Sequence, residues 1–182
     1  MKIALISDTH LAAHTHAFRR NAEAARDWIA AEAPDLTIHL GDITACGSEA
    51  PEQFEEAATV FAGFPRDIRF LPGNHDVGDN PGETFTGKEP AVSPALLAHF
   101  RRVFGADRWR IDAEGWRLIG LNAQLFGAGD AEEVAQFAWL EAALADAEGP
   151  IGLFLHKPLS GTGRKTPRCI TAMCRTRPGG GS

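Results

Sequence analysis

The stretch KIALISDTH, residues 2–10, joins a short apolar segment to polar side chains and sets the pattern for the rest of the chain. Residues 2–7 are an apolar run typical of a buried strand, and Asp8 and His10 follow it directly. The same arrangement recurs three more times. LTIHL (residues 36–40) precedes Gly41-Asp42, IRFLP (68–72) precedes Gly73-Asn74-His75-Asp76, and IGLFL (151–155) precedes His156. The sequence therefore predicts strands whose carboxyl ends carry polar side chains.

Segments with helical periodicity separate these strands. Residues 17–33 and 51–62 are each expected to form a helix between two of the first three strands, and this order predicts a parallel sheet. In the first helix, apolar residues recur at helical spacing and are expected to face the core: Phe18, Ala22, Ala25, Trp28 and Ile29. Downstream, we expect a surface loop over 79–93, helices over 94–104 and 131–146, and strands over 108–111 and 116–122.

The carboxyl ends of parallel strands meet at one edge of a sheet, where ligands bind in open α/β folds. Four strand ends would bring the following residues to that edge: Asp8, His10, Asp42, Asn74, His75 and His156. Carboxylate, imidazole and amide groups are ligands for Mn, Fe, Zn or Mg rather than for a soft metal. The sequence thus predicts a metal site at this edge.

Two divalent ions sharing one ligand would give such a site a defined chemistry. Asp42 follows the middle strand of the first three, and a carboxylate can bridge two ions. Two ions about 3.5–4 Å apart polarise a phosphoryl group and lower the pKa of a bridging water, which becomes a hydroxide nucleophile. A histidine beside the site can protonate the leaving oxygen. Hydrolysis of a phosphate ester is therefore the expected reaction.

In this order, Asp8-x-His10, Gly41-Asp42, Gly73-Asn74-His75-Asp76 and the later His156 resemble the signature of the calcineurin-like metallophosphoesterases. The segment SDTHL is most similar to the branch that holds cyclic-nucleotide phosphodiesterase-like enzymes. The resemblance covers residues 1 to about 159. It implies an α/β fold, a four-layer β-sandwich of mixed sheets flanked by helices, with the C-terminal strands of the second sheet missing.

The resemblance also implies a role for each residue. Asp8 and His10 would bind a first metal ion, Asp42 would bridge, and Asn74 and His156 would bind a second ion. His75 would contact the phosphate and protonate the leaving group, with Asp76 orienting it. The implied cofactors are two divalent ions, and the implied substrate is a small phosphodiester or phosphomonoester, with a cyclic nucleotide among the candidates.

The chain departs from the family pattern after His156. The family signature ends with Gly-His-x-His, but no histidine follows His156 here, so each ion would lack one expected ligand. A catalytically impaired remnant and a non-catalytic metal-binding scaffold are therefore alternatives to the enzyme. Residues 160–182 form a basic, Gly/Pro-rich tail without acidic residues, which we expect to be disordered and separate from a domain over 1–159. A truncated or frameshifted C-terminus would explain this change of composition.

Composition excludes several other classes of protein. The formal net charge of −6 argues against non-specific binding of a nucleic-acid polymer, because such proteins are usually basic. No apolar run approaches the roughly 20 residues that span a bilayer. Three cysteines without a paired pattern argue against a disulfide framework, and a cytoplasmic location is expected.

Several residues also have simpler interpretations. Asp8-x-His10 alone would suit a turn or a helix cap, and His156 alone would suit the end of a packed strand. His14 and His16 are expected in a solvated loop, and His39 is expected to be structural because it alternates with Ile38 and Leu40 in a strand.

Overall fold

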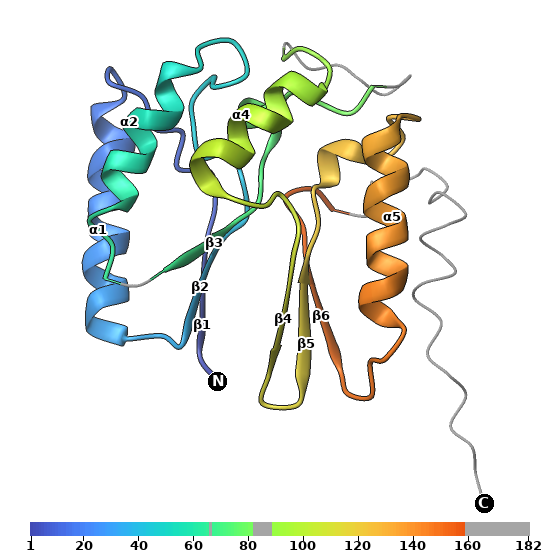
Figure 1. The fold of residues 1–182 in the computed structure, drawn as a ribbon. Helices are drawn as coiled ribbons and strands as arrows, with labels where there is room; N and C mark the ends of the chain where they lie inside the picture. The colour runs from blue at the N-terminus through green and yellow to red at the C-terminus, as the bar shows by residue number, and fades with distance from the viewer. Residues whose placement is uncertain (66, 82–88, 159–182) are drawn as a thin grey trace, which may run out of the picture.

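The computed structural model describes residues 1–65, 67–81 and 89–158, and two three-stranded sheets form its centre (Figure 1). The first sheet has the order β1 (Ile3–Ile6), β2 (Leu36–His39) and β3 (Ile68–Phe70), and all its strands are parallel. This confirms the parallel sheet that the alternation of strands and helices predicts. Asp42 does follow the middle strand.

The second sheet is mixed. A two-residue turn with positive φ at Glu114 (49°) and Gly115 (78°) connects β4 (Trp109–Ala113) to β5 (Trp116–Gly120), which pair antiparallel. Such a turn matches the right-handed twist of the strands it joins. β6 (Ile151–Phe154) pairs parallel with β5. β1, β2, β3 and β6 all run toward the same end of the molecule, the upper end in Figure 1.

Helices cover the outer face of each sheet. α1 (His16–Glu32) and α2 (Glu52–Phe61) pack on the first sheet, and α5 (Ala131–Leu144) packs on the second (Figure 1). α4 (Pro94–Phe104) contributes Leu97 and Phe100 to the core on the side of α2. The arrangement of helix, sheet, sheet and helix is the predicted four-layer α/β sandwich.

The two sheets pack face to face through a cluster of buried apolar side chains. Ile38 and Leu71 from the first sheet region meet Trp109 and Leu118 from the second. Each fully buried side chain of this size contributes about 1.5–3 kcal/mol of burial free energy. The indole nitrogen of Trp109 also donates to the carbonyl of Phe70 at 3.2 Å. These contacts join the two sheets, and Phe154 at the end of β6 packs against the same cluster as Ile38 of β2.

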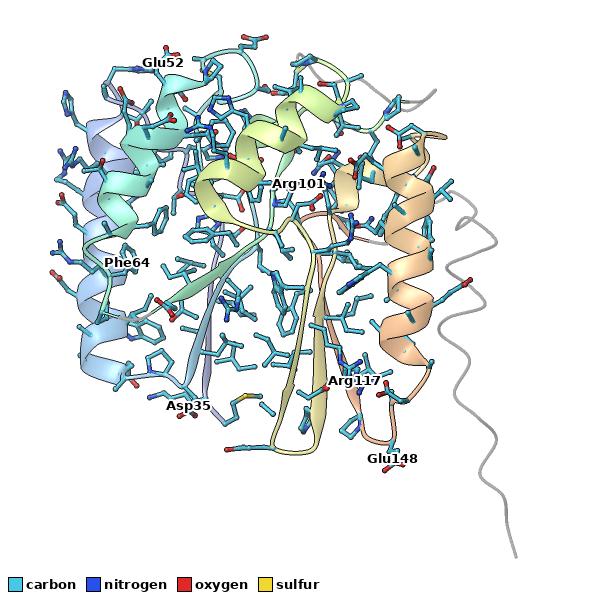
Figure 2. The ribbon with its side chains drawn as sticks, in the orientation of Figure 1. Asp35, Glu52, Phe64, Arg101, Arg117 and Glu148 are labelled. Atoms are coloured by element: carbon cyan, nitrogen blue, oxygen red, sulfur yellow. The ribbon has the colours of Figure 1, made fainter. Side chains whose placement is uncertain are left out.

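An ion-pair network fixes α4 to the start of α5. Arg101 on α4 donates through Nε to Asp107 at 2.8 Å and through Nη2 to Glu132 at 2.7 Å, and it lies between these two helices in Figure 2. Asp107 is 2% exposed, so its paired contacts matter more than those of a surface ion pair. The network therefore holds α4 against the start of α5.

Two features differ from the expectations. Phe18 and Trp28 are 42% and 52% exposed rather than in the core, and only Ala22 and Ile29 of the predicted face are fully buried. Two short helices, α3 (Asn74–Val77) and η1 (Ala123–Leu125), were not expected. The predicted tail, residues 160–182, lies outside the described residues. No helix in the described ranges is both long and apolar enough to cross a membrane.

Candidate metal centre

Two neighbouring loops carry the first three predicted ligands. The loop after β1 and the loop after β2 run side by side: Asp8 N donates to Gly41 O at 3.0 Å, and His10 N donates to Asp42 O at 3.1 Å. These backbone hydrogen bonds continue the pairing of β1 with β2 beyond the strand ends. They place Asp8, His10 and Asp42 on adjacent turns of chain.

All three residues have left-handed backbone conformations. The φ angles are 58° at Asp8, 42° at His10 and 53° at Asp42. Non-glycine residues adopt positive φ uncommonly, and Asp and His are among those that tolerate it best. Backbone strain of this kind is concentrated at functional sites, where the surrounding structure holds it in place. Here it turns the three side chains toward one edge of the sheet.

The side chains form two groups that share Asp42. In one group, donor atoms of His10, Asp42 and His75 all lie within 4.8 Å of one another, and in the other, those of Asp8, Asp42 and His156 do. Asp42 Oδ2 lies 3.9 Å from Nε2 of both His10 and His75, while Asp42 Oδ1 lies 3.4 Å from Nε2 of His156. One oxygen of the Asp42 carboxylate thus faces the imidazoles of His10 and His75, and the other faces the imidazole of His156.

Asp8 belongs to the group of His156, although its Oδ1 also lies 3.8 Å from Nε2 of His10. Its side chain is 57% exposed, whereas that of Asp42 is 8% exposed. The structure therefore places a buried carboxylate at the centre of the cluster and an open carboxylate at its edge.

The environment of Asp42 suits a bound cation. In the described part of the chain, no lysine or arginine lies within ion-pair distance of Asp42, and its ion-pair partners there are three imidazoles. A buried carboxylate is costly unless a cation compensates it. The imidazole nitrogen and carboxylate oxygen donors match the borderline divalent metals.

A buried nitrogen of His156 is a second indication that the cluster suits a bound cation. The His156 side chain is 9% exposed, and its Nδ1 is buried with no hydrogen-bond partner among the described residues. Buried polar atoms are normally paired. The donor set and the unpaired atoms therefore fit a divalent metal ion.

His75 presents one defined nitrogen to the cluster. Its Nδ1 lies 2.6 Å from the carbonyl oxygen of Ala45, and because a carbonyl only accepts, Nδ1 carries a proton and donates. Nε2 then points toward Asp42 and lies 3.5 Å from Oε1 of Glu89. The His10 and His75 rings meet edge to face, with centroids 4.7 Å apart. A backbone carbonyl therefore fixes the orientation of His75.

Asp76 does not orient the His75 ring, contrary to the role that the family resemblance implies. Its carboxylate accepts hydrogen bonds from Gly73 N at 2.9 Å, Ile43 N at 3.1 Å, and both the N–H and the hydroxyl of Thr44 at 2.9 and 2.7 Å. Asp76 is fully buried, and burial raises the pKa of its carboxyl against the opposing effect of these donors. Asp76 instead joins the loop of Asp42 to the loop of Asn74.

Asn74 begins α3 immediately after Gly73 and is partly buried. The loops here approach so closely that two glycines are required. A Cβ at Gly41 (φ 121°) would fall 2.7 Å from Gly73 N and 2.8 Å from Nδ1 of His156. The backbone therefore brings Asn74 to the same edge as Asp42 and His156.

Hydrogen bonds of the buried His39 ring connect the loop after β1 to the loop after β2. Gly41 N donates to its Nδ1 at 3.1 Å, so its Nε2 carries the proton and donates to Thr9 Oγ1 at 2.9 Å. The Thr9 hydroxyl in turn donates to Ile43 O at 3.1 Å. Burial lowers the pKa of His39 to about 3, which keeps the ring neutral. The structural role predicted for His39 is confirmed, and its link to Thr9 is new.

Three contacts of the site carried no signal in the sequence. Glu89 is an isolated acidic residue in a predicted loop, and the carbonyl of Ala45 belongs to no motif. Phe18 stands in the predicted core face of a helix, yet its ring lies 5.7 Å from that of His10. A loop contact of this kind depends on tertiary structure alone, so no local pattern could have identified it.

Comparisons with known proteins indicate the family and the fold. The family model of the calcineurin-like phosphoesterases matches residues 1–172, past the boundary predicted at residue 159. A dimetal phosphatase from Danio rerio has a similar fold (TM-score 0.59, 15% identity), with 88% of this chain and 70% of that chain covered.

A purple acid phosphatase from yellow lupin (Lupinus luteus) seeds is also similar in fold, with a TM-score of 0.58 and 15% identity. The match covers 81% of this chain but only 28% of the lupin enzyme. No curated protein matches the chain in sequence. On the strength of the family-model match over most of its length, the chain belongs to the calcineurin-like phosphoesterase family.

Proposed function

We propose that this protein is a metal-dependent phosphoesterase that hydrolyses a small phosphodiester or phosphomonoester with two divalent ions. The observation that supports this most strongly is the shared carboxylate of Asp42, which faces one donor group on each of its two oxygens. Such an arrangement suits two ions held close together. The dimetal phosphatase from Danio rerio, which has a similar fold, adds support.

Each candidate ligand has a place in this proposal. Following the family resemblance, Asp8 and His10 would hold one ion, Asn74 and His156 the other, and Asp42 both. Asp8 Oδ1 lies 3.8 Å from His10 Nε2, although the donor atoms of Asp8 also group with those of His156. When bound, two such ions polarise the phosphoryl oxygens and lower the pKa of a coordinated water. The chain's own contribution is to hold the ligand loops rigidly, through the hydrogen bonds of Asp76 and His39.

His75 is proposed as the proton donor to the leaving group. Its Nδ1 is committed to the carbonyl of Ala45, so Nε2 is the nitrogen that faces the cluster. A proton held there can pass to the leaving oxygen of a substrate bound at the same edge. We propose that Asp76 acts indirectly, by holding the Asn74-His75 backbone against the Asp42 loop.

The residues of the site indicate the type of reaction, but they do not select one substrate or one metal. Mn, Fe, Zn or Mg would all accept these ligands, so availability decides among them. The acidic chain is not suited to a nucleic-acid polymer, and a small substrate such as a cyclic nucleotide is compatible with the open edge. We place the protein in the cytoplasm because its three cysteines form no paired pattern.

A non-catalytic metal-binding protein is the second candidate, and one observation favours it. No histidine follows His156, so the Gly-His-x-His ligands of the family signature are absent from this chain. Water can occupy an empty coordination position, as it does in catalytic metal sites. Metal binding without turnover would identify this second candidate.

The deciding experiment measures hydrolysis of bis(p-nitrophenyl) phosphate by the full chain with Mn²⁺ and after chelation. We expect turnover that chelation abolishes and that Asp42→Asn reduces by roughly 100-fold or more, since both ions lose a ligand. Asp27→Asn, which alters a carboxylate that is 71% exposed on α1, serves as the matched control and should retain full activity. Folded, metal-loaded protein without turnover would contradict the proposal.

A further inference from the structure

Backbone hydrogen bonds from the N–H and to the carbonyl of Asp79 hold the segment that follows Glu89, and so place Glu89 beside the metal centre. Asp79 N donates to Pro90 O at 2.8 Å, and Val92 N donates to Asp79 O at 2.9 Å. Gly78 lies so close to this segment that a Cβ there would fall 2.5 Å from Pro90 O. Since Asp79 is only three residues after Asp76, the position of Glu89 is coupled directly to the helix that carries His75.

The carboxylate of Glu89 lies on the His75 side of the cluster. Its Oε1 lies 3.5 Å from Nε2 of His75, the nitrogen that faces Asp42, and its side chain is only 18% exposed. A partly buried carboxylate exerts a stronger field than one on the open surface, because less water screens it. A phosphoryl group bound within reach of His75 therefore experiences the charge of Glu89.

Basic side chains near the cluster are engaged elsewhere. Lys157, which follows His156, forms an ion pair with Asp79 and donates to Asn80 at 2.8 Å. Within the described ranges, the ion-pair partners of Asp8, Asp42 and Glu89 are all histidines. In that part of the chain, no arginine pairs with these three carboxylates to hold at the cluster the guanidinium fork that commonly binds the extra negative charge of a phosphate group.

We infer that Glu89 makes this site selective for phosphodiesters over phosphomonoesters, by repulsion of the second negative charge. The inference rests on the proposed phosphoesterase function and assigns its substrate class. A phosphomonoester carries nearly two charges near neutral pH because its second pKa is about 6, whereas a diester carries one. Specificity of this kind arises from an unfavourable contact with the wrong substrate, and like charges placed together are costly.

The test uses two substrates with the same leaving group, p-nitrophenyl phosphate and bis(p-nitrophenyl) phosphate, and the full chain loaded with Mn²⁺. Because p-nitrophenolate leaves as a stable anion, the comparison reports on phosphoryl charge rather than on proton donation. We expect wild type to prefer the diester in kcat/KM. In Glu89→Gln the ratio of monoester to diester kcat/KM should rise about tenfold.

Glu141→Gln on α5 is the matched control, because it removes one exposed carboxylate without contact to the cluster, and its ratio should equal that of wild type. A calorimetric titration gives a second reading: Glu89→Gln should tighten binding of inorganic phosphate relative to dimethyl phosphate by a similar factor. Both titrations use Mn²⁺-loaded protein, so they need no turnover.

The outcomes separate this inference from the proposed function. Metal-dependent turnover with the same substrate ratio in wild type and Glu89→Gln would overturn the role of Glu89 and leave the phosphoesterase intact. A wild type that prefers the monoester would also overturn it. No turnover of either substrate by metal-loaded protein would refute the phosphoesterase and the selectivity together.

Discussion

Gly73 lies directly against the carboxylate of Asp42: a Cβ placed on Gly73 would fall 2.0 Å from Asp42 Oδ1. The φ angle of Gly73 is −103°, so any residue could adopt its backbone conformation, and space alone requires the glycine. The loops that follow β2 and β3 therefore meet at the carboxylate of Asp42, the centre of the proposed site.

Substitution of this glycine should damage the site more than the fold. Gly73→Ala must displace Asp42 or the start of α3, and we expect loss of metal binding together with about 1–3 kcal/mol of stability. Metal content by mass spectrometry and urea unfolding would measure both. Gly63→Ala is the control, since a Cβ there would meet Val60 O at 3.4 Å and Arg26 Cδ at 3.9 Å, both without a severe clash. Normal metal content in Gly73→Ala would show that the Asp42 loop tolerates displacement.

Asp42→Asn should have opposite effects on the metal-free and metal-loaded protein. Among the described residues the buried carboxylate forms ion pairs only with imidazoles, and the carboxyl groups of Asp8 and Asp76 lie nearby, so without metal its charge is poorly compensated. Asparagine tolerates the positive φ of 53° and keeps an acceptor for His75 N.

We therefore expect the metal-free variant to be about 0.5–2 kcal/mol more stable than metal-free wild type. Added Mn²⁺ should stabilise wild type and have little effect on the variant. Thermal unfolding with and without metal would measure this. A metal-free Asp42→Asn protein less stable than wild type would mean that Asp42 has a structural role independent of metal.

His75→Ala should affect substrates according to their leaving groups. A proton donor matters most where the leaving oxygen is strongly basic. We expect the variant to lose roughly 100-fold or more in kcat with diphenyl phosphate, and much less with bis(p-nitrophenyl) phosphate, whose leaving group needs no proton. An equal loss with both substrates would indicate that His75 binds metal or phosphate instead.

His39 should make the stability of the protein depend on pH. Burial lowers its pKa to about 3, below the ordinary value of 6.5, so the unfolded chain binds one proton more between these values. Its contribution is fully present above about pH 6.5 and falls as the pH decreases, by up to about 1.4 kcal/mol per pH unit.

Urea unfolding of His39→Gln from about pH 4 to about pH 7 should show a correspondingly shallower slope than wild type. His99→Gln, which alters a histidine that is 27% exposed, is the control for loss of a histidine. Identical slopes in wild type and His39→Gln would show that His39 does not remain neutral in the fold.

Much of the fold could be predicted because the local signals are strong and agree with one another. Apolar runs such as Ile3–Ile6 and Ile151–Phe154 form strands where expected, and β4 and β5 form where strands over 108–111 and 116–122 are predicted. The convergence of Asp8, His10, Asp42 and His75 follows from the parallel arrangement of β1, β2 and β3, which the order of elements determines. His156 follows β6 of the second sheet, so it reaches the cluster through the packing of the two sheets rather than as the fourth strand end of one sheet.

The rest depends on contacts that sequence spacing does not encode. Periodicity placed Phe18 and Trp28 on the buried face of α1, but the contact surface of the helix is narrower than its apolar face, and both remain exposed. A motif indicates that Asp76 matters without showing that its partners are the Asp42 and Gly73 loops. The position of Glu89 beside His75 depends on hydrogen bonds to Asp79 that link distant segments.

The most direct measurement is electron paramagnetic resonance of the full chain titrated with Mn²⁺, compared with Asp42→Asn. A carboxylate that serves two ions about 3.5–4 Å apart predicts binding of about two Mn²⁺ per chain and a spin-coupled spectrum, which Asp42→Asn abolishes. A single uncoupled Mn²⁺ per chain, or a spectrum that is the same in wild type and Asp42→Asn, would contradict a two-metal centre built on Asp42.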